Sequence, residues 1–162
     1  MFHQATTGLS RFGGKATRSL YGNYGYVFRA GSASMEAMTG FLATVLICDD
    51  EPSLRELIRV SLDGPYEFVE ADDGEKSLEI ARRLRPDIVI LDLMMPRRSG
   101  LEVLTEIRRD ERLSDMAVIV LTAAQPATRE EALRQGADVV LVKPFEPDEI
   151  TALVEEVLAE RV

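Results

Sequence analysis

Five polar side chains stand directly after short apolar runs, where buried strands would end. They are Asp49, Asp50, Asp92, Thr122 and Lys143. Three carboxylates brought together repel one another, and the usual remedies are a raised pKa or a bound cation. Oxygen ligands without histidine or cysteine suit Mg²⁺, which binds one or two carboxylates together with phosphate oxygens. The lysine adds positive charge and the threonine a hydroxyl donor, so the five residues predict a site for a phosphoryl group.

Asp92 is the central member of this set. It follows the unbroken apolar run 88–91, which is typical of a strand buried on both faces of a parallel sheet. Ligands of open α/β sheets bind at the carboxyl ends of the strands, so a carboxylate placed there is a functional candidate. The alternative is that Asp92 caps the next helix, but Ser99 already supplies that cap, with Glu102 completing a capping box.

The rest of the sequence predicts the elements that position these side chains. Apolar runs predict strands at residues 44–48, 67–70, 88–91, 117–121 and 139–142. Periodic apolar positions predict helices at about 52–62, 73–84, 99–109, 128–136 and 147–160. Thr128 and Glu131 predict a capping box for the fourth helix. The repeated alternation of strand and helix predicts an α/β fold, with a parallel sheet covered by helices on both faces, in a single domain.

Charge divides the chain near residue 40. Residues 1–40 carry four basic residues and one acid, a net charge of +3, whereas residues 41–162 carry 15 basic and 27 acidic residues, a net charge of −12. Nucleic-acid binding depends on neutralising phosphates with lysine and arginine, so the acidic part predicts no nucleic-acid partner. Residues 41–162 are expected to be the folded domain, and residues 1–40, which show no periodicity, an irregular or disordered extension.

Three explanations of residues 1–40 stay open. Translation starts at Met35 or Met38, or the segment is a functional tail, or it is an acid-poor targeting peptide. The single cysteine, Cys48, lies in an apolar run, where it is expected to be a small core residue in a reducing, cytoplasmic setting. No apolar run approaches the roughly 20 residues of a membrane helix, so no membrane partner is expected.

Residues 43–161 resemble the receiver domain of two-component response regulators. The resemblance rests on four segments in this order: VLICDDEPSLRELI, DIVILDLMMPRRSGLEVL, VIVLTA and GADVVLVKPF. It implies a flavodoxin-like, five-stranded doubly wound parallel sheet of order 2-1-3-4-5, similar to a chemotaxis receiver. It also implies a phosphoprotein that acts in signal transduction, within a two-component system or phosphorelay.

The resemblance implies a role for each acidic residue. Asp92 matches the phosphoacceptor, and Asp49 and Asp50 match the acidic pair that holds Mg²⁺. The metal ligands of the family would then be Asp49, Asp50, Asp92 and the backbone carbonyl of Met94.

The other matched positions imply the switch. Thr122 is the switch hydroxyl, Lys143 pairs with the acceptor and then with the phosphoryl group, and Ala123 leaves the site open beside them. The Lys143–Pro144 bond is expected to be cis, as is typical of the family. Val140 departs from the pattern, because the family commonly has tyrosine or phenylalanine there. Valine cannot report activation by rotation of an aromatic ring.

The predicted function is that of a stand-alone response regulator receiver. It accepts a phosphoryl group from a partner phosphohistidine onto Asp92 with Mg²⁺, and relays the signal through protein–protein contacts. The only histidine, His3, lies in the extension, so a histidine kinase or phosphotransfer protein is implied; the downstream protein target is unknown. The chain is expected not to be an enzyme beyond catalysing its own phosphorylation and dephosphorylation, and to be a monomer or weak dimer.

Alternative interpretations keep the fold but change the function. One is a receiver-fold scaffold that works without phosphorylation, and another is a receiver excised from a longer regulator. An aspartyl-phosphate phosphohydrolase would generally need a second aspartate where Met94 stands. A flavin- or nucleotide-binding protein would need a glycine- or serine/threonine-rich loop in place of Asp49, Asp50 and Glu51.

Overall fold

The apolar runs of the sequence form five parallel strands. The structure is a computed structural model that describes residues 18–19, 27–28, 43–123 and 125–161. The strands of the sheet are β3 (Ala43–Cys48), β4 (Tyr66–Ala71), β5 (Ile88–Asp92), β6 (Ala117–Thr122) and β7 (Val139–Val142). Their order is β4-β3-β5-β6-β7, with every neighbouring pair parallel. Counted along the sheet's own strands this is 2-1-3-4-5, so the predicted flavodoxin-like fold is confirmed.

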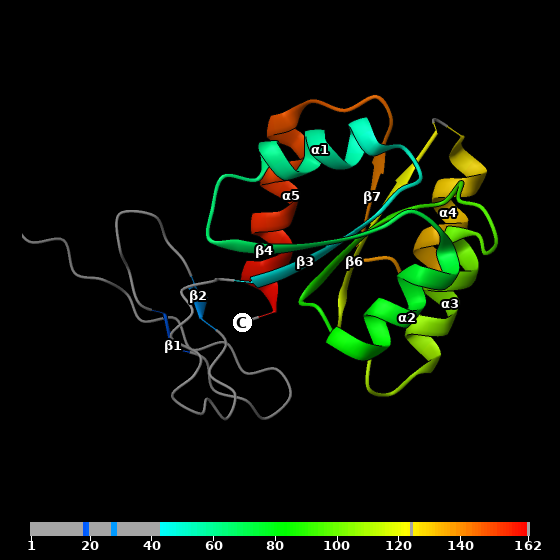
Figure 1. The fold of residues 1–162 in the computed structure, drawn as a ribbon, viewed down its shortest axis with the longest axis horizontal. Helices are drawn as coiled ribbons and strands as arrows, with labels where there is room; N and C mark the ends of the chain where they lie inside the picture. Colours follow the sequence, from blue (N-terminus) through cyan, green and yellow to red (C-terminus); the bar gives the residue numbers. More distant parts are fainter. Residues whose placement is uncertain (1–17, 20–26, 29–42, 124, 162) are drawn as a thin grey trace, which may run out of the picture. The chain divides into compact units, whose positions relative to one another are not determined.

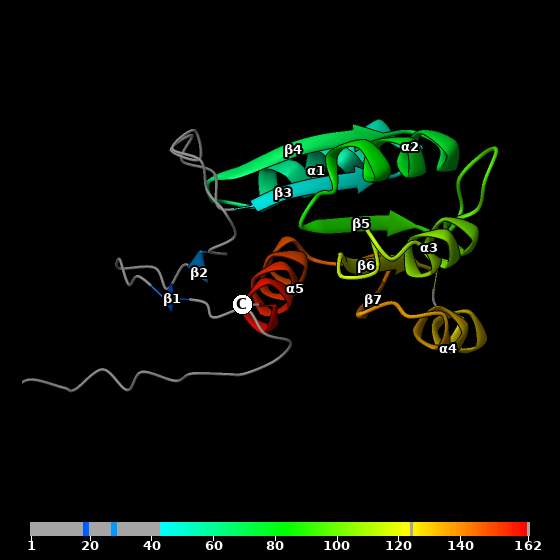
Figure 2. The same ribbon diagram turned by 90° about the horizontal axis from the view of Figure 1, so that it is seen from below.

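Helices cover both faces of this sheet (Figure 1). They are α1 (Pro52–Ser61), α2 (Gly74–Leu84), α3 (Gly100–Arg109), α4 (Pro126–Arg134) and α5 (Pro147–Glu160). Side chains of α1 and α5 share one apolar core with the sheet, and those of α2, α3 and α4 share the core on its other face. Figure 2 shows the strands following one another in the order β4, β3, β5, β6, β7. Among the described residues, no helix is both long and apolar enough to cross a membrane.

The strands in the middle of the sheet are fully enclosed. Every residue of β5 and β6 is buried, as expected for strands with helices on both sides. Cys48, at the end of β3, is buried as well, and its burial raises the pKa of the thiol to about 12. It is therefore the core residue that its apolar run predicts, without the reactivity of a thiolate.

The chain divides into two units, Met1–Gly40 with Val162, and Phe41–Arg161. Of the first unit the structure describes β1 (Arg18–Ser19) and β2 (Val27–Phe28), which pair antiparallel. The remaining positions of residues 1–40 lie outside the described residues, and so does most of the predicted irregular or disordered extension. That prediction, and the explanations offered for the segment, stay predictions.

Side chains cap the starts of α2 and α3, and the cap of α3 is the predicted one. Asp73 caps α2, accepting a hydrogen bond of 2.8 Å from the backbone N–H of Lys76. Ser99 and Glu102 form the complete capping box at the start of α3. The cap explains why α3 begins directly after the loop that follows Asp92, without using the carboxylate of Asp92 itself.

The predicted capping box of the fourth helix is wrong. Helix α4 begins at Pro126, with Gln125 at the N-cap, so Thr128 lies inside the first turn. The Glu131 carboxylate accepts a hydrogen bond from the side chain of Gln135 instead of reaching back to the helix start. Proline has no N–H and a backbone angle suited to the first helical turn, which accounts for the earlier start.

Gly100 is required by the close approach of α3 to the end of β5. A Cβ atom at this position would lie 2.3 Å from the carbonyl oxygen of Asp92 and 2.7 Å from the Cα of Leu93. Both contacts are with backbone, so the strand end or the helix would have to shift. We expect Gly100→Ala to lower the free energy of unfolding by about 1–3 kcal/mol, as overpacked sites do. Urea unfolding of the two proteins measures this, and equal stabilities would contradict it.

Candidate functional site

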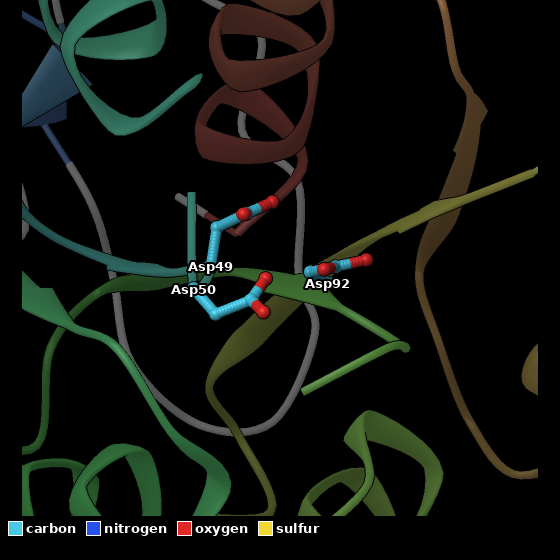
Figure 3. A group of neighbouring side chains, drawn as sticks. All are labelled: Asp49, Asp50 and Asp92. Atoms are coloured by element: carbon cyan, nitrogen blue, oxygen red, sulfur yellow. The ribbon is translucent and has the colours of Figure 1, made fainter. Parts of the chain in front are cut away.

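The carboxyl ends of four neighbouring strands bring the five predicted residues together. Asp49 and Asp50 follow β3, Asp92 and Thr122 end β5 and β6, and Lys143 follows β7. Figure 3 shows the three aspartates gathered at the ends of β3 and β5. Each of them offers a carboxylate oxygen within 4.8 Å of those of the other two. The edge of the sheet that the sequence pattern indicates is therefore the one at which the charged residues meet.

Asp49 is held on both of its carboxylate oxygens. One accepts a hydrogen bond of 2.8 Å from the backbone N–H of Glu51, and the other accepts one of 3.1 Å from Nζ of Lys143. The residue is 1% exposed, whereas the adjacent Asp50 is exposed. Asp50 is thus the acid of the group that is most accessible to a ligand from solvent.

Asp92 is buried beside another carboxylate. The pKa of Asp92 is raised above its ordinary value of 3.8, first by burial and then by the charge of Asp49. The charge of Lys143 and the N–H of Met94, which donates to Asp92 Oδ1 at 3.3 Å, act in the opposite direction. The negative charge of Asp92 is therefore unfavourable in this site, and a bound cation would stabilise it.

Lys143 is the cation already present. Its Nζ lies 3.1 Å from Asp49 Oδ2 and 3.3 Å from Asp92 Oδ1. Burial lowers the pKa of Lys143, but hydrogen bonds and charges from the two aspartates outweigh it, so the pKa stays above the ordinary 10.5. The ammonium group remains charged at neutral pH and links the ends of β3 and β5 to the end of β7.

The other predicted residues surround this cluster. Thr122 is buried at the end of β6, and Ala123, next to it, is exposed. The Lys143–Pro144 bond is cis, as the resemblance implies. Val140 is half-buried in β7 and packs against the core on the side of α2 and α3.

Met94 projects its side chain into solvent, with 79% of the residue exposed. Its N–H is the group that reaches Asp92. The proposed ligand is the carbonyl of Met94, and its role as a metal ligand stays a prediction.

One residue near the site escapes prediction from the sequence. Arg55 of α1 donates a hydrogen bond of 2.7 Å from Nη1 to the backbone carbonyl of Asp49. A contact with a backbone carbonyl leaves no motif, and the helix periodicity shows only that Arg55 lies beside the apolar Leu54. The only indication in the sequence is that Arg55 lies in the first turn of a helix that follows the acidic pair, close enough for its side chain to contact the backbone of that pair.

The raised pKa of Asp92 predicts a pH-dependent stability. Between pH 3.8 and the higher folded pKa, the folded protein binds more protons than the unfolded chain, so the stability falls as the pH rises through this window. In metal-free buffer we expect Asp92→Asn to raise the melting temperature at pH 7, with a gain that disappears as the pH falls below 3.8. Melting curves across this range measure the effect, with the exposed Asp63→Asn as control. A gain independent of pH, or a loss at pH 7, would contradict it.

Comparison with known proteins identifies the family of this fold. Residues 45–155 match the family model of the response regulator receiver domain. The chemotaxis response regulator CheY4 of Vibrio cholerae is 33% identical, with a TM-score of 0.67 over 72% of this chain and 98% of that chain. The likeness extends over almost the whole of that structure.

Two curated relatives are regulators of transcription. The DNA-binding dual master transcriptional regulator RpaA of Synechocystis is 39% identical over 116 residues, which cover 70% of this chain and 48% of RpaA. The phosphate regulon transcriptional regulatory protein PhoB of Pseudomonas aeruginosa is 38% identical over 117 residues, covering 71% of this chain and 51% of PhoB. The chain thus spans about half the length of these relatives.

These relatives overturn the prediction of no nucleic-acid partner. That prediction used the net charge of residues 41–162. The charge of one segment indicates only whether that segment itself binds nucleic acid. RpaA is named as DNA-binding, and this chain matches only 48% of its length. An acidic receiver is therefore no argument against DNA as a partner of such a regulator.

The family model covers more than two thirds of the chain, and the order of the strands agrees with the fold of this family. The chain belongs to the response regulator receiver family.

Proposed function

We propose that this chain is a phosphorylation-controlled receiver that accepts a phosphoryl group from a phosphohistidine of another protein onto Asp92. The observation that carries the proposal is the position of Lys143, whose Nζ lies within 3.3 Å of both Asp49 and Asp92. The exposed Asp50 stands beside them. A nucleophilic carboxylate, a fixed cation and an accessible acid beside them are the parts that phosphoryl transfer requires.

The donor set fits Mg²⁺, because it consists of carboxylate oxygens from three chain positions without histidine or cysteine. Asp49, Asp50 and Asp92 would hold the ion, together with the carbonyl of Met94. When bound, the metal supplies positive charge that balances the phosphoryl oxygens.

The residues of the chain carry out the transfer. An oxygen of Asp92 attacks the phosphorus, the bond from phosphorus to the donor nitrogen breaks, and its electron pair leaves with the histidine of the donor. The product is an acyl phosphate on Asp92. Lys143 and the Thr122 hydroxyl bind phosphoryl oxygens, and hydrolysis of the acyl phosphate resets the receiver.

In this proposal the chain acts on no other substrate: it catalyses its own phosphorylation and dephosphorylation in the cytoplasm. The names of RpaA and PhoB support control of transcription as the output. With Val140 in β7, the change at Thr122 reaches the surface of α4 by movement of the backbone and not by rotation of an aromatic ring. Stand-alone action of the receiver stays a prediction.

The intact mass after incubation with acetyl phosphate tests the proposal. We expect a gain of one phosphoryl group that requires Mg²⁺ and is abolished by a chelator. Neutral hydroxylamine should remove the group, because it cleaves acyl phosphates and leaves phosphate esters of serine and threonine intact. A folded protein that takes up no phosphoryl group would contradict the proposal and favour a scaffold that works without phosphorylation.

A further inference from the structure

Arg55 lies between the acidic pair and the neighbouring strand. Its Nη1 donates to the carbonyl oxygen of Asp49 at 2.7 Å, and its Nε donates to Glu70 Oε2, at the end of β4, at 2.8 Å. The side chain of Arg55 is 15% exposed and that of Glu70 is 36% exposed. Glu70 thus orients the guanidinium group of Arg55 so that it can bind the carbonyl oxygen of Asp49.

The carbonyl that Arg55 binds belongs to the peptide bond between Asp49 and Asp50. This group is planar, so fixing its oxygen fixes the whole plane. The Cα of Asp50 lies in the same plane, so holding this plane fixes the point from which the side chain of Asp50 leaves the backbone. Asp49 has its own side-chain hydrogen bonds to Glu51 and Lys143, and Arg55 adds the constraint on the backbone between the two acids.

We propose that Arg55, oriented by Glu70, is a positioning residue that holds the Asp49–Asp50 peptide in the conformation in which Asp50 binds the divalent cation. This inference rests on the proposed function, because it concerns the same metal. In this arrangement the acids bind the cation, and Arg55 of α1 holds the backbone between Asp49 and Asp50 in place before the cation binds. Hydrogen-bond partners of metal ligands typically contribute 10- to 100-fold to metal affinity.

The positive charge of Arg55 would act in the opposite direction, because a cation near the site repels a second cation. The ion pair with Glu70 offsets this charge. Two substitutions separate geometry from charge. Arg55→Gln removes the charge and the forked donor, whereas Arg55→Lys keeps the charge but cannot make both bonds with one ammonium group in the planar arrangement of arginine.

The test is the rise in melting temperature caused by Mg²⁺ in the absence of any phosphodonor. Each variant is compared with its own metal-free melting temperature, so a loss of stability alone does not count. A ligand that binds only the folded state raises its stability in proportion to ln(1 + [Mg²⁺]/Kd), which yields Kd. We expect Arg55→Gln and Arg55→Lys each to weaken Mg²⁺ binding by about tenfold, the lower end of the range for such partners.

Two further variants complete the experiment. Arg59→Gln lies one turn later on α1 and removes an arginine that pairs with Glu56, so it should bind Mg²⁺ like the parent. Glu70→Gln leaves Arg55 in place but removes the charge that orients it, and should weaken binding by less than Arg55→Gln. It also serves as the test if both Arg55 variants fail to fold.

The possible outcomes distinguish the two proposals. If the parent responds to Mg²⁺ and Arg55→Gln binds it equally or more tightly, the positioning role is wrong and the proposed function stands. If Arg55→Gln binds more tightly and Arg55→Lys like the parent, the residue acts through its charge alone, which also overturns the proposal. A parent whose melting temperature does not respond to Mg²⁺ would overturn this inference together with the magnesium site of the proposed function.

Discussion

The Asp92→Asn variant is expected to gain no phosphoryl group under conditions in which the parent protein gains one. The amide is close to the carboxylate in shape, so the variant should keep the fold. It lacks the anionic oxygen that attacks phosphorus, and the other acids of the cluster lie in less suitable places. Both carboxylate oxygens of Asp49 already accept hydrogen bonds, from Glu51 and Lys143. Asp50 forms no ion pair with Lys143, whose ammonium group pairs with Asp49 and Asp92 among the described residues.

The measurement is intact mass after incubation with Mg²⁺ and acetyl phosphate. Asp63→Asn is the matched control, because it makes the same chemical change at an exposed carboxylate in the segment between α1 and β4. It should take up the phosphoryl group like the parent. A phosphoryl group on folded Asp92→Asn at the parent's rate would place the acceptor at another residue and overturn the role given to Asp92.

The sheet could be predicted from the sequence because its central strands carry the strongest pattern. Strands buried on both faces have unbroken apolar runs, and in a parallel sheet the residues after those runs must share one edge. The places of Asp92, Thr122 and Lys143 follow from this rule alone. The order of the strands does not follow from any run, and it came from the resemblance to a known family.

Other features could not be predicted, for physical reasons that differ. Two signals for the start of α4 compete within three residues, a proline at 126 and a threonine at 128, and the backbone preference of Pro126 prevails. The contact of Arg55 with a backbone carbonyl depends on the position of α1 after folding. The partner prediction failed because the charge of the receiver part says nothing of what a whole regulator binds.

The second large effect is expected at Lys143. We expect Lys143→Met to slow phosphorylation by acetyl phosphate by roughly 10²- to 10³-fold, which is the usual cost of removing one preorganised donor to charge that develops in a transition state. Methionine keeps much of the length and apolar character of the side chain. What it removes is the ammonium group that lies 3.1 Å from Asp49 and 3.3 Å from Asp92.

The same substitution should change the stability with pH in a definite direction. Without the cation, burial and the charge of Asp49, which raise the pKa of Asp92, are opposed only by the N–H of Met94, so this pKa should rise further. The loss of stability in Lys143→Met should therefore be largest at neutral pH and shrink as the carboxylates become protonated at low pH.

Lys76→Met is the matched control for both measurements, because Lys76 is a more exposed lysine of α2 that pairs with Asp72. It should be phosphorylated at the rate of the parent. Its pair with Asp72 is exposed to solvent, so its change of stability with pH should have the same direction but be much smaller. A Lys143→Met protein that is phosphorylated as fast as the parent would show that the ammonium group only holds the strand ends together. A slow reaction together with unchanged stability at every pH would contradict the predicted change in stability. It would show that Lys143 stabilises the transition state but not the pair of aspartates in the folded protein.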